Sequence, residues 1–122
     1  MTLRYDQDRR RIICRWEEPT RIVIDKREGT IKRSRSISVK VSETGKLNSK
    51  DSARHSDHPM YRHISNFNSK LNKMNFFPLK HEGYRCSVCG SEHNVNPHFD
   101  VSGQNIIWLC RAHQRSSPKI DA

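Results

Sequence analysis

The hydrophobic positions in the first third of the chain follow a β-like pattern. Apolar residues there form short runs or alternate with serine and lysine, as at Ile37, Val39 and Val41. A period of two places successive side chains on opposite faces of a strand. Residues 12–41 are therefore predicted to form an antiparallel hairpin with one solvated face, turning around residues 26–29.

A helical pattern follows farther along the chain. Its apolar residues recur at intervals of four, three, four and three, at Met60, Ile64, Phe67, Leu71 and Met74. This spacing lines one face of an α-helix, and Asp57 with Pro59 supplies a start signal. We predict an amphipathic helix over residues 57–78, with its apolar stripe in the core.

Polar segments separate these elements. Residues 1–11 carry many charges, end in three consecutive arginines and offer little to bury, so they are predicted to form a basic arm that is mobile or ordered by a partner. Residues 42–56 are rich in Ser, Lys, Asn and Asp, which is typical of a linker. Residues 79–122 are predicted to form a separate C-terminal module.

That module contains two pairs of metal-ligand residues. Cys86 and Cys89 are two residues apart and precede Gly90, and Cys110 and His113 are also two residues apart. Zinc prefers four tetrahedral sulfur or nitrogen ligands, and this separation is common in zinc ribbons and treble clefs. The sequence predicts a structural Zn²⁺ site. His81, His93 and His98 are alternative fourth ligands, but spacing favours His113.

The segment between the two pairs reads as strand, turn and strand, leading into a helix that carries the second pair. This order of a zinc knuckle, a hairpin and a helix predicts a treble clef. The predicted fold class is therefore α+β, with a basic N-terminal β-hairpin region, an amphipathic helix and a C-terminal zinc module.

Over roughly residues 84–116 the sequence resembles the HNH family, in particular its small cysteine-containing members common in phages. The resemblance implies a ββα nuclease module with His98 as the general base that activates water and Asn105 as the residue that fixes the hairpin loop. It also implies a catalytic divalent cation such as Mg²⁺. Phe99 and Gln114, however, stand where active members carry metal-binding histidines.

These departures favour a degenerate module that does not cleave, because phosphodiester hydrolysis needs a cation to stabilise developing charge. In this interpretation His98 either donates to phosphate or a partner, or simply packs within the hairpin. Two other routes to a catalytic metal remain open: Asp100 as an oxygen ligand, or His113 as a catalytic rather than a structural ligand.

Composition adds a charged partner to this picture. The chain of 122 residues has a formal net charge of +10 and only 33% hydrophobic residues, so it buries a modest core and favours polyanions, nucleic acid before a membrane surface. No segment is apolar enough for a membrane span or a secretory signal, which predicts a reducing, cytoplasmic location.

The candidate nucleic-acid contacts are basic residues in the arm, the hairpin and the last helix. They are Arg9, Arg10, Arg11, Lys32, Arg33, Arg35, Lys40, Arg111 and Arg115. The lysines and arginines of the hairpin equally suit a protected edge strand, and those of the last helix equally suit interaction with the helix dipole.

Three functions follow as hypotheses. The first is zinc-stabilised nucleic-acid binding, with DNA favoured over RNA. The second is a metal-dependent HNH endonuclease with His98 as base. The third is a phage-type factor that binds a host enzyme through the arm and the 57–78 helix, with zinc as scaffold.

Overall fold

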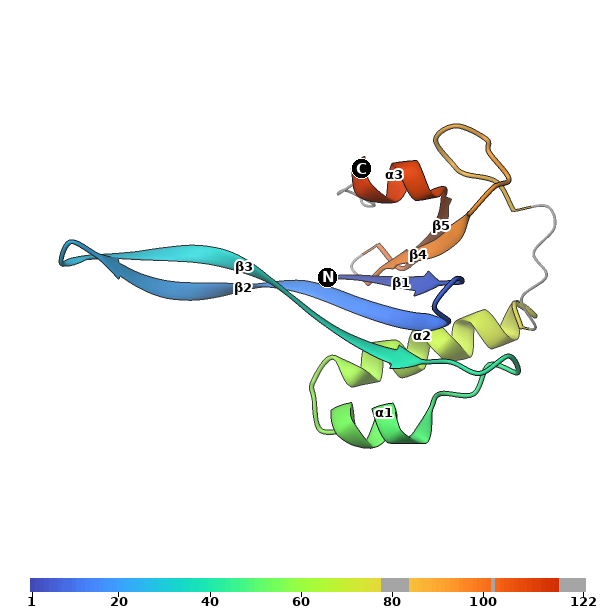
Figure 1. Ribbon diagram of the computed structural model, residues 1–122, viewed down its shortest axis with the longest axis horizontal. Coiled ribbons are helices and arrows are strands. Elements are labelled where there is room, and N and C mark those ends of the chain that lie inside the picture. Colours follow the sequence, from blue (N-terminus) through green and yellow to red (C-terminus); the bar gives the residue numbers. More distant parts are fainter. Residues whose placement is uncertain (78–83, 102, 117–122) are drawn as a thin grey trace.

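A five-stranded antiparallel sheet with strand order β3-β2-β1-β4-β5 runs through the protein (Figure 1). The computed structural model describes residues 1–77, 84–101 and 103–116, and side chains as far as His113. The elements are β1 (Thr2–Asp6), β2 (Arg11–Ile24), β3 (Arg27–Lys40), α1 (Ser49–His55), α2 (Tyr61–Lys73), β4 (Asn96–Asp100), β5 (Asn105–Leu109) and α3 (Arg111–Ser116). The predicted mixture of strands and helices is confirmed, and strands are the larger part.

Strand β1 lies in the middle of the sheet, so the prediction of an N-terminal arm is wrong. Leu3 and Tyr5 point into the core and are fully buried. The polar residues that alternate with them, Thr2, Arg4 and Asp6, point to the other face. Leu3 pairs with Cys14 on one side and with Phe99 on the other. The first strand therefore joins the N-terminal hairpin to the C-terminal one in a single sheet, so β4 and β5 do not form a module separate from the N-terminal strands.

The predicted hairpin over residues 12–41 is present and longer than its apolar pattern indicates. Strands β2 and β3 pair from Arg11–Lys40 to Ile24–Arg27, so the turn is at Asp25 and Lys26 rather than over residues 26–29. Both turn residues have positive φ, 51° and 66°, as a two-residue hairpin turn requires. The distal half of this ribbon extends well beyond the rest of the protein (Figure 1).

The segment predicted as a linker over residues 42–56 contains helix α1. The side chain of Asn48 accepts hydrogen bonds from the backbone N–H groups of Lys50 and Asp51 and caps the helix. Asp51 then accepts from the backbone N–H of Lys40. These contacts fix α1 against the end of β3, so residues 42–56 are not a boundary between independent units.

Helix α2 confirms the predicted amphipathic helix but is shorter than residues 57–78. Ile64, Phe67 and Leu71 are buried against the sheet, in one cluster with Leu3, Tyr5, Ile12, Cys14, Trp16 and Val39. The helix ends before Asn75, whose φ of 55° leaves the helical region. Pro78, the predicted end, lies outside the described residues.

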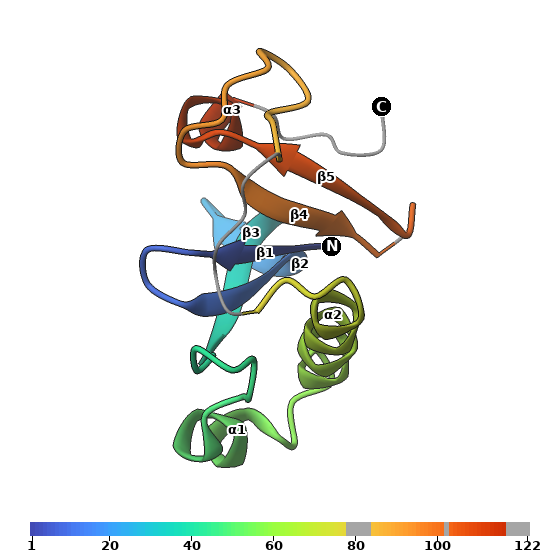
Figure 2. The same cartoon turned by 90° about the vertical axis from the view of Figure 1, so that its right-hand side faces the viewer.

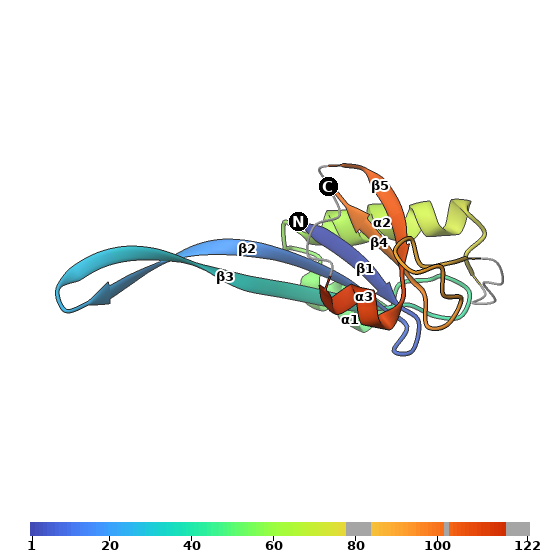
Figure 3. The same ribbon diagram turned by 90° about the horizontal axis from the view of Figure 1, so that it is seen from above.

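Helices α2 and α3 lie on opposite sides of the sheet (Figures 2 and 3). Helix α2 covers the face that carries the apolar side chains of β1 and β2. Helix α3 follows β5 and packs near it on the other side. In the described part of the chain, no helix has the length and apolar character needed to cross a membrane.

Candidate metal centre

Two turns bring the cysteines and the histidine together. The first is a knuckle in which Cys86 O accepts from Gly90 N at 2.9 Å and Cys86 N donates to Ser91 O at 2.9 Å. Gly90 has φ +74°, a conformation that favours glycine, so its place in the motif has a direct backbone reason. The second turn opens α3, where His113 N donates to Cys110 O at 3.1 Å.

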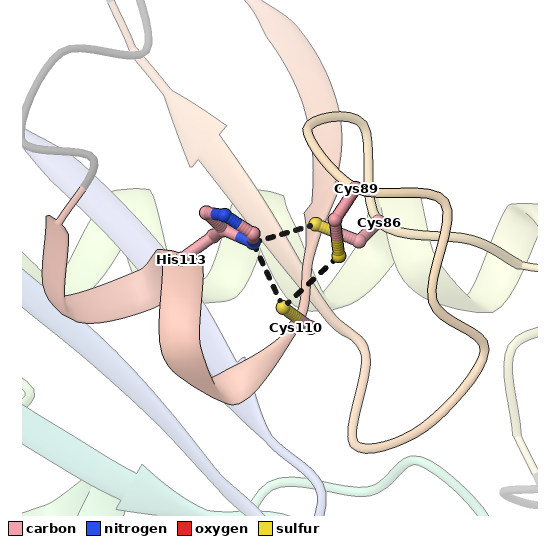
Figure 4. A group of neighbouring side chains, drawn as sticks. All are labelled: Cys86, Cys89, Cys110 and His113. Carbon is pink, nitrogen blue, oxygen red and sulfur yellow. Dashed lines mark hydrogen bonds between the residues drawn. The ribbon is translucent and has the colours of Figure 1, made fainter.

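The four side chains converge on one point (Figure 4). His113 Nδ1 lies 3.0 Å from Cys110 Sγ and 3.4 Å from Cys86 Sγ, and Cys89 Sγ lies 3.7 Å from Cys110 Sγ. All four ligand atoms lie within 4.8 Å of one another. A tetrahedral zinc ion with Zn–S near 2.3 Å would separate two sulfurs by about 3.8 Å. The cluster could therefore bind a metal, and its donor set and distances suit Zn²⁺.

The Cys86 thiol is partly prepared for metal binding. Burial raises the pKa of the Cys86 thiol, but backbone N–H groups of Cys110, Cys89 and Val88 outweigh this effect and lower the pKa to about 6. Thiolate is the form that binds metals.

Cys89 and Cys110 do not form a disulfide. Their sulfur separation of 3.7 Å is far from the roughly 2.05 Å of a disulfide, and both cysteines are free.

The alternative ligands do not join this cluster. His93 is exposed, and His98 is buried on β4; neither belongs to the group that could hold a metal. His81 lies outside the described residues. The fourth donor in the described part of the chain is thus His113, as its spacing predicts.

The cluster is anchored to the sheet through Trp108. Ser87 N donates to Trp108 O at 2.7 Å, which ties the knuckle to β5. The Trp108 ring stacks on Tyr84 at 3.9 Å and on Phe76 at 5.6 Å. Trp108 therefore packs within the protein, between the knuckle and the end of α2.

His98 is sheltered on β4 and faces away from α2. Its side chain is 7% exposed, and Nε2 is buried with no hydrogen-bond partner among the described residues. Burial, with a smaller contribution from the charge of Arg4 on the neighbouring strand, lowers the pKa of His98 to about 4. The imidazole is therefore neutral at physiological pH, and its Nε2 is shielded from solvent.

Lowering the pH should destabilise the folded protein through the buried imidazole of His98. An unfolded histidine has a pKa of about 6.5, so between pH 6.5 and 4 the unfolded chain binds a proton that folded His98 does not. The contribution of neutral His98 to the free energy of unfolding is fully present above pH 6.5. About 2–3 kcal/mol of this free energy is lost by pH 4. The stability advantage of the wild type over His98→Gln should therefore shrink as pH falls, in urea unfolding at pH 7, 6, 5 and 4. Parallel profiles would contradict this assignment.

Phe99 and Asn105, two positions that the HNH resemblance singled out near His98, have different surroundings. Phe99 points to the opposite face of β4 and stacks on Phe67 of α2, with centroids 5.6 Å apart and planes 9° apart. A side chain at this position cannot share a metal with His98 without leaving the core. Asn105 is exposed at the start of β5 and pairs with Asp100, next to the hairpin turn.

Asp100 shares the face of β4 with His98, because strand side chains alternate, and it is 4% exposed. In the part of the chain that the structure describes, the only group of three or more His, Cys, Asp or Glu donors is the one at Cys86, Cys89, Cys110 and His113. His98 and Asp100 therefore form no such group there.

The predicted basic contacts at the start of β2 are partly used within the protein. Arg10 pairs with Glu43 at 2.9 Å, and Arg11 approaches Asp51 at 3.4 Å. Arg9 is exposed in the β1–β2 turn. Arg11 therefore lies beside α1, and none of the three arginines is on a separate arm.

The other predicted contacts are dispersed. Lys32 lies on one face of β3, whereas Arg33 and Arg35 lie on the other, and Arg35 pairs with Glu18 at 3.5 Å. Of the remaining candidates, Lys40 is exposed at the end of β3, and Arg111 is exposed at the start of α3. The side chain of Arg115 lies outside the described part.

Two further arginines were missed by sequence reasoning. Arg4 and Arg15 share the face of the sheet that carries Arg11, as their pairing register shows. Neither belongs to a run of basic residues, so charge clustering along the chain could not find them. A period-two reading of residues 2–6 would have separated Arg4 from the buried Leu3 and Tyr5.

Comparison with protein-family models, curated proteins and solved structures gave no match for this chain.

Proposed function

We propose that this protein is a zinc-stabilised nucleic-acid-binding protein, with DNA as the favoured target. In this proposal its C-terminal β-hairpin and α3 form a degenerate HNH-like treble clef that does not cleave. The observation that carries the proposal is the convergence of Cys86, Cys89, Cys110 and His113 beside a sheet, in a chain with a net charge of +10. A reducing, cytoplasmic environment would keep the thiols available.

The ligands would act as a structural clip. When bound, Zn²⁺ would supply the bonds that hold the knuckle at residues 86–90 to the start of α3. Cys110 follows β5 directly, so the same clip orients α3 over the sheet. The chain is small and has a modest core. In this proposal the bound metal rigidifies the surface around the cluster, so that its basic side chains hold fixed positions.

The surroundings of His98 support a binding role over cleavage. A general base must reach the water it activates, directly or through one intervening water, and Nε2 of His98 is buried without a partner in the described structure. The low pKa of His98 also makes its imidazole a weak base. Phe99, which stands at a metal-ligand position of the family, belongs instead to the packing against α2.

The positions of two segments give less support to the protein-capture hypothesis. The first residues form the central strand β1, and the apolar face of α2 is covered by the sheet. Nucleic-acid binding needs neither segment to be free.

Titration of labelled 30-base-pair DNA tests the proposal. Neutralising about three phosphates gives a log–log salt slope near −3, and binding should weaken roughly 50-fold between 50 and 200 mM salt. Fluorescence anisotropy measures both values. Binding that does not depend on salt, or no binding at 50 mM salt, would overturn the proposed function.

The same DNA checks for cleavage. With Mg²⁺ or Mn²⁺ added it should keep its full length on a denaturing gel. Cutting by the wild type that disappears in His98→Ala would show a nuclease instead, with His98 as its base.

A further inference from the structure

One face of the sheet has no described helix over β1 and β2, and α1 lies beside it at the end of β3. Helix α2 covers the opposite face, and α3 lies near β5 (Figures 2 and 3). On the open face the register places Arg4, Ile13 and Ser38 in one row. Neighbouring rows hold Arg11 with Lys40, and Arg15 with Ser36. None of these side chains is fully buried.

The open face combines guanidinium and hydroxyl groups. Strand β3 contributes Ser34, Ser36 and Ser38, which alternate with the residues that point to the other face. Arg15 Nε donates to Ser34 Oγ at 2.7 Å, and Arg11 Nη1 donates to Ser38 Oγ at 3.1 Å. These hydrogen bonds hold two long side chains along the strand. Because a guanidinium has five N–H donors, each arginine keeps donors for a ligand.

Charge on this face favours an anion. Its strand positions from Thr2 to Asp6, Arg11 to Glu17 and Ser34 to Lys40 carry four cations, at Arg4, Arg11, Arg15 and Lys40, against the two carboxylates of Asp6 and Glu17. Asp6 lies 3.7 Å from Arg4, and Asp51 of α1 approaches Arg11 from the side. Arg15 and Lys40 are exposed. Arginine, lysine and serine are the side chains that commonly contact phosphate oxygens.

The side chains of this face favour a duplex over a single strand. Single-strand binding sites combine charge with aromatic rings on which bases stack. The open face of β1, β2 and β3 has no aromatic side chain at these positions, where Ile13 is its one large apolar residue.

We propose that this arginine–serine face, defined by Arg4, Arg11, Arg15, Lys40, Ser34, Ser36 and Ser38, binds the phosphate backbone of duplex nucleic acid without reading base sequence. The inference rests on the proposed nucleic-acid binding and assigns it to one surface. Guanidinium and lysine groups neutralise phosphates, and the serines permit close approach of the backbone because their side chains are short. The predicted contacts Arg33 and Arg35 lie on the opposite face and are not part of this surface.

The test compares two double variants that remove the same charge. Arg4→Gln with Arg15→Gln removes two cations from the arginine–serine face, whereas Arg54→Gln with Arg62→Gln removes two exposed cations elsewhere. The first variant should bind a 30-base-pair duplex about tenfold or more weakly, with a salt slope reduced in magnitude by about 2. The control should stay within about threefold of the wild type. Two duplexes of unrelated sequence should give equal affinities, and a single strand should bind more weakly.

Arg15→Gln with Lys40→Gln provides a second variant on exposed strand positions, in case loss of Arg4 disturbs the sheet. Circular dichroism and thermal unfolding verify that each variant is folded. If the wild type binds with the expected salt dependence but variants of this face behave like the control, the surface assignment fails and the proposed function stands. If the wild type does not bind, the proposed function itself fails. Equal or tighter binding of a single strand overturns the duplex assignment.

Discussion

Replacing Cys110 by serine is expected to abolish metal binding and to destabilise the protein by several kcal/mol. Cys110 Sγ lies within 3.7 Å of both Cys89 Sγ and His113 Nδ1, so its loss removes a donor from the centre of the cluster. Structural zinc in small domains contributes about 10–16 kcal/mol of apparent binding free energy, and much of that acts as folding free energy. Part of the sheet has its own core, so the effect should be smaller here. Elemental analysis and urea unfolding measure both changes.

Cys14→Ala is the matched control for this experiment. Cys14 is fully buried in the sheet core, and burial raises the pKa of its thiol to about 11. This variant loses a thiol and some packing but should retain about one metal ion per chain. Equal metal content in Cys110→Ser and the wild type would exclude the assigned centre. A chelator should lower the melting temperature of the wild type and leave that of Cys110→Ser unchanged.

Replacing Phe67 by alanine should lower the free energy of unfolding by about 3–5 kcal/mol, the range for truncating a buried phenylalanine. Phe67 is fully buried on α2 and stacks on Phe99 of β4. It therefore connects α2 to β4, which pairs with β5, the strand that leads to Cys110. Denaturant unfolding at constant metal concentration measures the change.

A double-mutant cycle separates the stacking from general burial. Phe67→Ala and Phe99→Ala should couple by about 0.5–1.5 kcal/mol because the two rings are in contact. Val41→Ala with Phe99→Ala is the control, since Val41 lies just past the end of β3, three strands from β4 and about 14 Å away. That pair should be additive within about 0.5 kcal/mol. Additivity of the Phe67–Phe99 pair would contradict a direct contact.

The features that the sequence predicted well depend on neighbours along the chain. The separation of two residues within Cys86–Cys89 and Cys110–His113 is a local property, and so is the alternation that leads to β2 and β3. Helix α2 likewise follows from the spacing of Ile64, Phe67 and Leu71. In each case the deciding interaction joins residues within one turn, one strand or one helix.

The features that were missed depend on partners far along the chain. Strand β1 has only five residues, and its charges suggested an arm; what fixes it is pairing with β4, where Leu3 meets Phe99. Helix α1 is short and polar and is held by the contact of Asp51 with Lys40. The grouping of Arg4 with Arg15 follows from strand register, which a single charged position does not reveal.

The central place of β1 has a consequence for synthesis of the chain. One edge of this strand pairs with β2 as soon as the first hairpin is complete, but its other edge pairs with β4, more than ninety residues later. During translation the growing chain therefore presents an unpaired strand edge until Phe99 has left the ribosome. The last metal ligand, His113, follows Phe99 by 14 residues, which places sheet completion and metal capture at the same late stage.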